Sequence, residues 1–478
     1  MEERKGFGTN FGFLMASVGS AVGLGNIWGF PDKMGANGGF TFLIIYLVLA
    51  VLCGFIVMVG ELALGRKTGQ GVVTAYKVLS KRFRWVGWLG ILSPFFILFF
   101  YCALGGYCLK YTVLNVGNLF NASFGSNGLS GSEVFDAFMA NPTEAVIYGL
   151  IFVALTMLIV MGGIGGGIEK VCSVGMPCLF VALLICIIRA CTLENAVDGL
   201  KYMFVPGWAL ANGVIDKAPN FFEVLSAAGG QMFFSLSLGM GIMITYGSYL
   251  DKKENLEKNA ILIIVMDTLV ALMAGLCVIP GRFALDPTGK LGGPSLLFVT
   301  MQNVFHNMGV VGPIFGILFY LLVVFAAISS SISLLEAVVA HFVDKARESG
   351  KGDKRKKYTL IAAVAVGVGC LLICADSLGG ASFTPWKLLG LETVSGWNDC
   401  WLDFFDMLSE GLMMPLSALM MSLMIGWELG PEVVKNECEA TPKHTMTSYG
   451  FFKICIRFIT PLCMLLVLYG QVSTFFGL

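Results

Sequence analysis

The chain has 478 residues, of which 56% are hydrophobic and 13% charged, and it carries no formal net charge at pH 7. Its mean hydropathy of +0.81 excludes an ordinary soluble protein, because a chain of this length cannot bury so much apolar surface around one core. The balanced charge gives no basis for binding nucleic acid, so we expect no such partner.

Eleven apolar segments are long enough to cross a bilayer as helices, which predicts an all-α integral membrane protein surrounded by lipid. In chain order they lie near residues 10–36, 40–65, 86–119, 144–163, 168–190, 221–249, 257–280, 309–343, 357–375, 403–427 and 449–475. No long polar region separates them. We therefore interpret residues 1–478 as a single membrane domain.

The positive charges in the connections predict the orientation. The connection 66–85 carries six Lys or Arg residues and 345–357 reads KARESGKGDKRKK, whereas 120–143 contains neither residue type. Cytoplasmic connections are enriched in Lys and Arg, which places the N-terminus in the cytoplasm and, after an odd number of crossings, the C-terminus outside. The first residues, MEERKGFG, lack the pattern of a cleaved signal peptide. These features predict a multi-pass protein of the plasma membrane, in bacteria the inner membrane.

Two of the apolar segments contain small residues that interrupt helices: GSAVGLGN at 19–26 and SLSLGMG at 235–241. In hydrocarbon every backbone N–H and C=O needs a partner, so a lost helical bond implies a cavity or a ligand. Alternatively, Gly19 and Gly23 form a GxxxG pattern that serves helix packing. Interruptions in the first and the sixth segment favour a transporter with an inverted repeat, in which 1–190 and 221–427 are the repeats and 449–475 is an additional helix.

Four motifs occur together in the chain: SAVGLGN at 20–26, GELALGR at 60–66, QMFFSLSLGMG at 231–241 and FAAISSSIS at 325–333. On these motifs the chain resembles the neurotransmitter:sodium symporter family, and within it the eleven-span bacterial amino-acid transporters. The resemblance implies the leucine-transporter fold, a 5+5 inverted repeat with discontinuous first and sixth helices. It also implies a sodium-coupled symporter that works by alternating access, not an enzyme.

The resemblance implies two sodium (Na+) sites built from oxygen ligands. One matches the carbonyls of Gly19, Val22 and Ala326 and the hydroxyls of Ser329 and Ser330. The other matches the Ala21 carbonyl and the side chains of Asn26, Ser235 and Asp267. From the residues alone, serines within a helix also fit a structural role, in which the hydroxyl bonds back to a carbonyl one turn earlier.

Asp267 is an acidic residue inside the apolar segment AILIIVMDTLVALMAG. An ionised carboxylate there costs roughly 2.5–3.5 kcal/mol on insertion scales, which makes it a functional candidate, with a structural or protonated acid as the alternative. In chloride-dependent relatives this position is neutral, and a serine one turn later helps to bind chloride. Here that later residue is Ala271. The resemblance therefore implies a chloride-independent transporter in which Asp267 supplies the negative charge.

The resemblance also implies a site for one amino acid. Its carboxylate would meet the N–H groups of Leu24 and Gly25 and the hydroxyl of Tyr101. Its ammonium would meet the carbonyls of Ala21, Phe234 and Ser235 and the hydroxyl of Ser237. Its side chain would lie among Ile97, Phe234, Met240, Ser330 and Leu334, of which Ile97 and Leu334 also fit ordinary packing.

The expected substrate follows from what this site lacks. Monoamine carriers have an aspartate where this chain has Gly23, so the ligand should bring its own carboxylate. The side-chain pocket has no fixed charge, and charged side chains would enter it at a large desolvation cost. We therefore expect neutral α-amino acids with large hydrophobic or aromatic side chains.

Support and inner-gate positions come from the same resemblance. Glu61 would accept hydrogen bonds from the unwound backbone of the first and sixth helices. Arg4 and Asp344 match an inner salt bridge, with Phe7 and Tyr249 nearby, although Arg4 also fits an ordinary positive-inside charge. The interval from Gly167 to Pro177 matches a motif that lets the fifth helix unwind.

The outer gate departs from the family. Gly29 stands at the position of the usual arginine, which pairs with a carboxylate in the tenth segment. Lys33, one turn further out, would instead reach Asp406, or else Asp403, without the bidentate geometry of arginine. Two further acids at membrane depth, Glu336 and Glu410, receive no role.

Two other functions stay open. Discontinuous helices and hydroxyl ligands also fit a Na+-conducting channel, and a transport-deficient amino-acid sensor would keep the same site. The chain contains no HExxH, GxSxG or GxxxxGK[ST] motif, which argues against an intramembrane enzyme. The oligomeric state, proton counter-transport and the exact amino acid stay undetermined.

Overall fold

The computed structural model describes residues 6–285, 296–350, 352, 354–381, 383–389 and 399–476. Within these ranges all regular structure is helical, which confirms the all-α prediction. The N-terminal half contains α1 (Asn10–Ala21), α2 (Phe30–Ala36), α3 (Phe40–Leu49), α4 (Phe55–Thr68), α5 (Val72–Leu79), α6 (Val86–Leu119), α7 (Gly131–Met139), α8 (Pro142–Met161), α9 (Glu169–Cys191), α10 (Ala196–Phe204) and α11 (Trp208–Ala211). The C-terminal half contains α12 (Phe221–Ser235), α13 (Ile242–Gly247), α14 (Leu256–Leu285), α15 (Met301–Asn307), α16 (Gly312–Glu348), α17 (Arg355–Asp376), α18 (Pro385–Leu389), α19 (Trp401–Asp406), α20 (Met414–Leu423), α21 (Glu432–Cys438), α22 (Tyr449–Ile454) and α23 (Thr460–Phe476).

Short helical turns of other pitch adjoin several of these helices. The π-helical turns are η1 (Gly25–Gly29), η2 (Ala50–Gly54), η3 (Ile164–Ile168), η4 (Leu296–Thr300), η6 (Met407–Met413), η7 (Met424–Leu429) and η8 (Cys455–Ile459), and η5 (Gly309–Val311) is a 3₁₀ turn. π-Helical turns inside α-helices are frequently found at functional sites.

Nine helical stretches of the described chain are long and apolar enough to cross a membrane. One further crossing is the pair 10–21 and 25–36, which bends by 48°. The sixth predicted segment is divided into α12 and α13, which have 15 and 6 residues and are too short to cross alone. Together these stretches cover the segments expected from hydropathy, and the chain is a multi-pass membrane protein.

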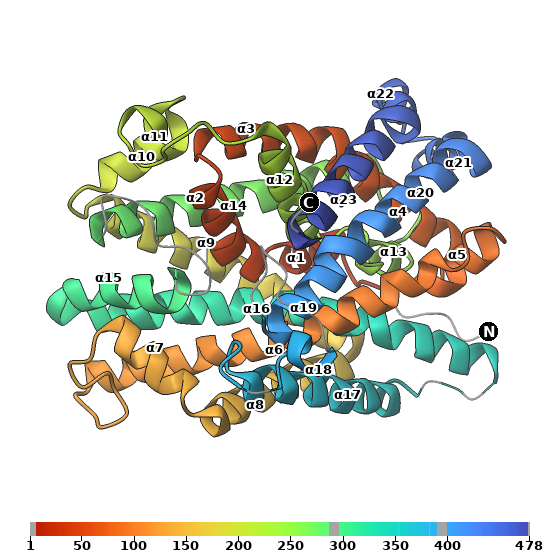
Figure 1. Cartoon of the computed structure of the whole chain (residues 1–478). Helices are drawn as coiled ribbons and strands as arrows, with labels where there is room; N and C mark the ends of the chain where they lie inside the picture. The colour runs from red at the N-terminus through yellow and green to blue at the C-terminus, as the bar shows by residue number, and fades with distance from the viewer. Residues whose placement is uncertain are drawn as a thin grey trace.

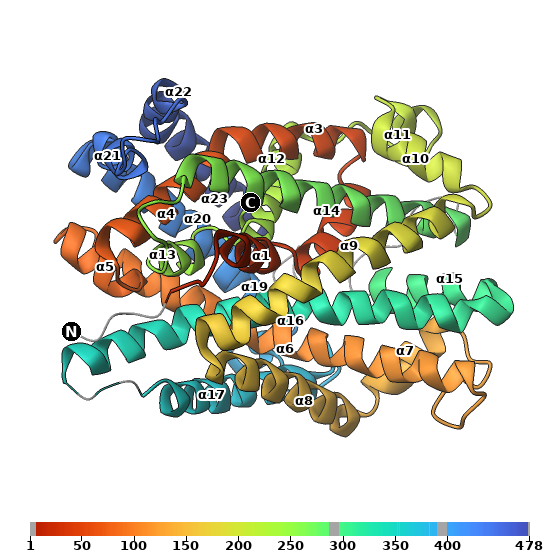
Figure 2. The ribbon, with the colours of Figure 1, turned by 180° about the vertical axis from the view of Figure 1, so that it is seen from behind.

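The connections between the long helices gather at two opposite ends of the bundle (Figure 1). Helices α7, α10, α11 and α15 lie at one end, and α5 and α21 lie at the other. Figure 2 shows the same division from behind. Three connections are expected on one side of the membrane: 120–143, 191–220 and 281–308. Their described residues lie together at the same end of the bundle. The separation of the ends agrees with the topology expected from the charge pattern.

The long helices enclose the first break. Helix α6 packs along α16, α8 and α17 pack beside them, and α14 packs against α1 and α9. As a result, residues 16–27 are all buried, although they contain the least regular backbone of the first crossing. The division into repeats at 1–190 and 221–427 stays a prediction.

In the first crossing, helix α1 ends at Ala21. The Val22 N–H still bonds to the Val18 carbonyl at 2.7 Å, but Val22 itself has an extended backbone, with φ −75° and ψ 101°. The chain resumes helical turns at η1, where the N–H groups of Asn26 and Ile27 bond to the Gly23 carbonyl. Several carbonyl and N–H groups between the two helices are therefore directed at neighbouring helices.

The sixth crossing breaks at a tight turn with two left-handed glycines. Helix α12 ends at Ser235, and Gly239 and Gly241 have φ values of +74° and +69°. A Cβ atom on Gly239 would lie 2.4 Å from the Met414 carbonyl oxygen, and one on Gly241 would lie 2.6 Å from the Gly90 carbonyl oxygen. Both backbone conformation and contact therefore require glycine at these two positions.

Candidate functional site

Two serines of α16 face the carbonyl groups that the first break frees. The Ser329 hydroxyl lies 2.9 Å from the Ala326 carbonyl oxygen and 3.4 Å from that of Val22. The Ser330 hydroxyl lies 3.0–3.3 Å from the carbonyl oxygens of Gly19, Ser20 and Val22. The structure thus brings together all five positions that were matched to one sodium site. Ser329 also makes the local bond of a structural serine, but Ser330 bonds across to α1.

Asp267 of α14 is fully buried and is the centre of a second polar cluster. The Asn26 amide donates to Asp267 Oδ1 at 2.8 Å, and the Ser235 hydroxyl donates to Oδ1 and Oδ2 at 3.1 and 2.9 Å. The other end of the Asn26 amide accepts the Gly23 N–H at 3.1 Å. The three side chains matched to the second sodium site are therefore in mutual contact, beside the broken backbone.

Tyr46 of α3 also belongs to this cluster. Its hydroxyl lies 3.4 Å from both Ser235 Oγ and Asp267 Oδ2. This residue was not predicted from the sequence, because a tyrosine in an apolar segment gives no sign of the partner that its hydroxyl will meet.

Nine of the eleven expected substrate residues line one small cavity between the two breaks, and Leu24 and Ser235 are not among its lining residues. The Tyr101 hydroxyl accepts the Leu24 N–H at 2.9 Å. The cavity measures about 20 Å³, so an amino acid fits only if lining side chains move. Its lining residues are Ser20, Ala21, Gly23, Gly25, Ile97, Tyr101, Phe234, Ser237, Met240, Ser330 and Leu334.

Gly23 has no space for a side chain. A Cβ atom there would lie 2.3 Å from the Tyr101 hydroxyl oxygen and 2.4 Å from Ser330 Oγ. A Cβ atom on Gly25 would lie 2.6 Å from the ring of Phe234. Glycine at these positions therefore lets the backbone approach the side chains of α6, α12 and α16.

The two breaks also support each other. The Ser237 hydroxyl donates to the Ser20 carbonyl at 2.9 Å, which joins the sixth crossing to the first. Glu61 of α4 is buried and accepts the Gly239 N–H at 2.8 Å, as expected for the sixth helix. The predicted bond from the first helix to Glu61 is not made by the described residues, and the Glu61 Oε2 atom has no partner among them.

A charged cluster lies between η6, α23 and α2, which is the C-terminal part of the first crossing. The Lys33 ammonium pairs with Glu410, whose side chain is 8% exposed, and Asp406 lines the same cavity of about 660 Å³. The expected pairing of Lys33 with Asp406 or Asp403 is thus replaced by one with Glu410. The π-helical turn η6 carries Glu410 and alters which face of the tenth crossing it occupies.

Gly29 lies next to Gln231 of α12, not next to a carboxylate. A Cβ atom on Gly29 would lie 2.9 Å from Gln231 Oε1, and the Gln231 amide donates to the Gly25 carbonyl at 2.8 Å. Gln231 Oε1 is buried without a partner among the described residues. The side chain of Gln231 thus fills the space in which a residue larger than glycine would begin.

The inner-gate residues lie at the opposite end of the bundle. The Phe7 ring packs against Tyr249 and Tyr246, with ring centroids 6.1 and 5.5 Å apart. Asp344 accepts the Gly71 N–H at 3.0 Å. Arg4, its expected partner, lies outside the described residues. Gly167 lies in η3 and Pro177 within α9, which together form a continuous helical stretch.

Two acidic residues to which the sequence assigned no role also lie at this end of the bundle. Glu336 is fully buried on α16, pairs with Arg355 and accepts the Tyr249 hydroxyl at 2.7 Å. Glu169 of α9 accepts the Gly8 N–H at 2.8 Å and the Thr9 hydroxyl at 3.1 Å, directly before α1 begins. Pairs so distant in the chain leave no local signal by which they could have been found.

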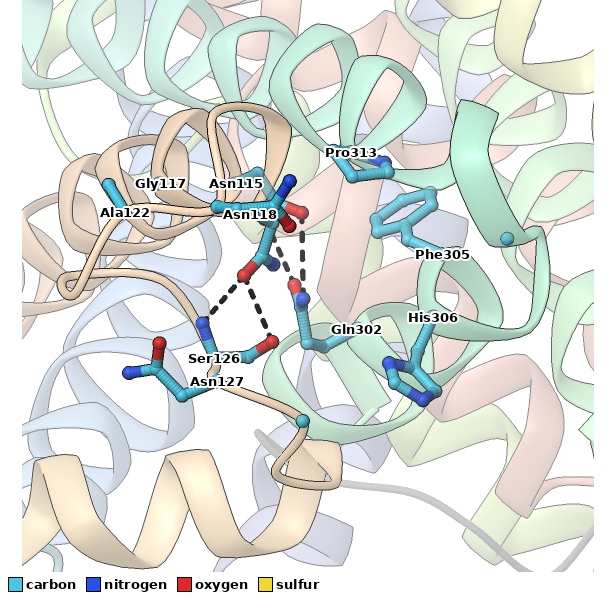
Figure 3. A pocket seen from close by; sticks show the side chains of 13 residues that line it. Asn115, Gly117, Asn118, Ala122, Ser126, Asn127, Gln302, Phe305, His306 and Pro313 are labelled. Carbon is cyan, nitrogen blue, oxygen red and sulfur yellow. Dashed lines mark hydrogen bonds between the residues drawn. The ribbon is translucent and has the colours of Figure 1, made fainter.

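A separate polar cavity of about 540 Å³ lies at the end of α6, beside α15 and the start of α16 (Figure 3). The amides of Asn115 and Gln302 bond to each other, and Asn118 accepts the Ser126 N–H and hydroxyl at 2.6 and 2.9 Å. These groups therefore fasten the loop after α6 to the bundle, and we assign them a structural role.

The model of the sodium:neurotransmitter symporter family matches residues 4–127 and 140–477. The chain belongs to this family. The resemblance expected from the motifs is thereby confirmed, and the chain is a sodium-dependent transporter. The expectation of a transporter and not an enzyme is consistent with this membership.

Similar proteins extend over nearly the whole chain. The chain is 33% identical to the sodium-dependent transporter YhdH of Bacillus subtilis over 471 residues, which is 96% of each protein. It is 24% identical to the sodium-dependent nutrient amino acid transporter 1 of Drosophila melanogaster over 535 aligned positions, covering 98% of this chain and 78% of that one. The crystal structure of MhsT in complex with L-phenylalanine matches with a TM-score of 0.83 and 32% identity, over 98% of this chain and 100% of MhsT. This match confirms the leucine-transporter fold.

Proposed function

We propose that this transporter imports neutral α-amino acids with large hydrophobic or aromatic side chains, in symport with two sodium ions and independently of chloride. The observation that carries the proposal is the buried cluster of Asn26, Ser235 and Asp267 beside the Leu24 backbone. Oxygen ligands with one negative charge suit a sodium ion, and N–H groups at a helix break suit a carboxylate. The phenylalanine bound in the MhsT crystal structure supports the same class of substrate.

The second sodium ion would be held by the neutral oxygens around Ser329 and Ser330. Two sodium ions that enter with a zwitterion move two positive charges inward. Each charge gains about 2.3 kcal/mol from a potential of 100 mV, so the pair draws roughly 4–5 kcal/mol from the membrane potential alone. This driving force is sufficient for strong accumulation of substrate.

Alternating access would use the charged groups at the two ends of the bundle. The proposed orientation in the plasma membrane places the N-terminus in the cytoplasm. In this orientation the Lys33–Glu410 pair and Asp406 close the external side. Arg4 and Asp344, with Phe7 and Tyr249, close the cytoplasmic side. Substrate and sodium would bind from outside and leave inward when the second set opens.

The first test is a thermal-shift screen of the purified protein against the twenty amino acids, in sodium chloride and in potassium chloride. A ligand stabilises the protein by RT ln(1 + [L]/Kd), so stabilisation by a few large neutral amino acids only in sodium supports the site. Uptake of those amino acids into liposomes then tests transport, and replacement of chloride by gluconate should leave uptake unchanged. Binding without uptake would identify a sensor, and sodium flux without a fixed substrate ratio would identify a channel.

A further inference from the structure

A cavity that no part of the transport site uses lies at the end of the bundle that carries α21. It has a volume of about 450 Å³ and is bounded by α1, the α13–α14 connection, the first turns of α14 and the α21–α22 connection. Lys253 and Lys258 line it, together with the amides of Asn10, Asn255 and Asn259 and the imidazole of His444.

With His444 counted as neutral, the side chains that line this cavity carry a formal net charge of +1. Neither Lys253 nor Lys258 forms a salt bridge with any residue that the structure describes. Glu254 also lines the cavity, and its backbone carbonyl accepts a hydrogen bond from Arg66 at 2.7 Å. Two ammonium groups and one carboxylate leave a surplus that a ligand with a single negative charge would neutralise.

The walls of the cavity are held in place by bonds among themselves. His444 Nε2 lies 2.8 Å from the Lys253 carbonyl oxygen, and Nδ1 lies 3.3 Å from the Asn255 amide. Asn255 accepts the Lys258 N–H at 2.9 Å, and the Asn259 amide donates to Asn10 Oδ1 at 3.0 Å. Because these groups are already ordered, a ligand would bind without the entropic cost of organising them.

The surface of α14 below the cavity indicates where the ligand comes from. Ile261, Leu262, Val265 and Leu269 are all exposed, and their spacing places them along one side of the helix in the direction of the membrane interior. Lys258 lies in the first turns of this membrane-crossing helix, at the level where lipid headgroups lie. The cavity therefore adjoins a surface that lipid acyl chains cover.

We propose that this cavity binds the phosphate of an anionic phospholipid with one net negative charge, as in phosphatidylglycerol. Lys253 and Lys258 contact the phosphate, the asparagine amides contact the headgroup hydroxyls, and one acyl chain follows the exposed side of α14. Since α1 contributes Asn10 to the cavity, the bound lipid also joins α1 to α14. The site is independent of amino-acid binding, so the two proposals succeed or fail separately.

The test uses the purified full chain in detergent and measures thermal stabilisation by short-chain phosphatidylglycerol. Phosphatidylethanolamine and phosphatidylcholine of the same chain length, and inorganic phosphate, are the comparison ligands. We expect phosphatidylglycerol to stabilise the protein most. The double variant Lys253→Gln/Lys258→Gln should weaken its apparent affinity roughly tenfold, because each basic residue near the headgroups contributes to binding an anionic lipid.

The matched control is Lys252→Gln/Lys356→Gln, which removes two exposed lysines that do not line the cavity. It should retain the affinity of the unchanged chain. An equal loss in both double variants would show general surface charge and overturn the site. Equal stabilisation by inorganic phosphate would show that the cavity binds free phosphate and not a lipid. Equal stabilisation by phosphatidylcholine would show that no net negative charge is needed on the headgroup. The melting temperature of each variant without added lipid reports separately whether it is folded.

Discussion

The ammonium of Lys33 contacts the carboxylate of Glu410, so that α2 and the π-helical turn η6 are joined by a charge pair at the outer end of the proposed substrate path. Lys33 stands one helical turn beyond Gly29, and Glu410 stands one turn beyond Asp406. The first crossing runs outward and the tenth runs inward, so Lys33 lies one turn nearer the outer end than Gly29, whereas Glu410 lies one turn deeper than Asp406. Because the two groups still meet, a pair that opens and closes would survive without the arginine.

Lys33→Met should slow sodium-coupled uptake roughly tenfold, because it leaves a poorly exposed carboxylate without its partner. Initial rates in liposomes with an imposed sodium gradient measure the effect. The double variant Lys33→Glu/Glu410→Lys should recover part of the rate, and Lys217→Met, which removes an exposed lysine outside this cavity, should not change it. Uptake by Lys33→Met at the original rate would rule out a gate at this pair.

Asp267→Asn should raise the sodium concentration needed for half-maximal substrate binding roughly tenfold to a hundredfold. The carboxylate accepts bonds from Asn26 and Ser235, and hydrogen bonds to a charged group contribute about 1.5–3 kcal/mol. Substrate-induced thermal shift at increasing sodium measures this. The double variant Asp267→Asn/Ala271→Ser should regain binding only when chloride is present. Recovery that is equal in gluconate would contradict the assignment of Asp267 as the substitute for chloride.

Ser330→Ala should weaken the other sodium site, because it removes the hydroxyl that faces three carbonyls of the first crossing. We expect the sodium dependence of uptake to become less steep and to shift roughly tenfold, the equivalent of about 1.4 kcal/mol. Ser331→Ala is the matched control, since the Ser331 hydroxyl is bonded to Thr156 at 2.8 Å on another side of α16. If both variants shifted the sodium curve alike, the effect would come from the helix and not from a cation site.

Gly23→Ala should abolish substrate binding, because the added methyl group would lie within 2.4 Å of the Tyr101 and Ser330 oxygens. The Tyr101 hydroxyl would have to lose the hydrogen bond that it now accepts from the Leu24 N–H. Gly450→Ala adds the same methyl group at a helical position with no atom within 4 Å, and it should bind substrate normally. Binding at original affinity by Gly23→Ala would contradict the placement of the substrate beside Tyr101.

Glu169→Gln should loosen the start of α1. The carboxylate accepts the Gly8 N–H and the Thr9 hydroxyl, and the neutral amide would hold both less strongly. We expect hydrogen exchange of residues 8–14 to accelerate roughly fivefold, a change of about 1 kcal/mol in the opening equilibrium. Glu133→Gln provides the control, because it weakens a comparable cap on α7 at the other end of the bundle. Unchanged exchange at 8–14 would show that Glu169 does not restrain α1.

Much of the architecture was predictable from the sequence. Hydropathy over windows of about twenty residues depends on composition alone, and it placed the crossing segments correctly. Glycine and serine at 19–26 and 235–241 marked both breaks, because the loss of helical hydrogen bonds in lipid leaves a local signal in residue type. The contacts of Asp267 with Asn26 and of Ser330 with the first crossing followed from the family motifs, and the structure brings these groups together.

Only the tertiary structure decided which distant groups meet. The partner of Lys33 depends on a π-helical turn that changes which face of the tenth crossing carries Glu410. The contacts of Tyr46 with Asp267, of Glu169 with the start of α1, and of Glu336 with Arg355 arise from the packing of helices that lie far apart in the chain or turn back upon each other. Each side chain by itself is an ordinary tyrosine, acid or base, and its hydrogen-bonding partner is determined by the rotation and depth of the neighbouring helices. Local composition therefore determined where this protein crosses the membrane and where its first and sixth crossing helices are interrupted. Packing determined which charges and hydroxyl groups face each other across these interruptions.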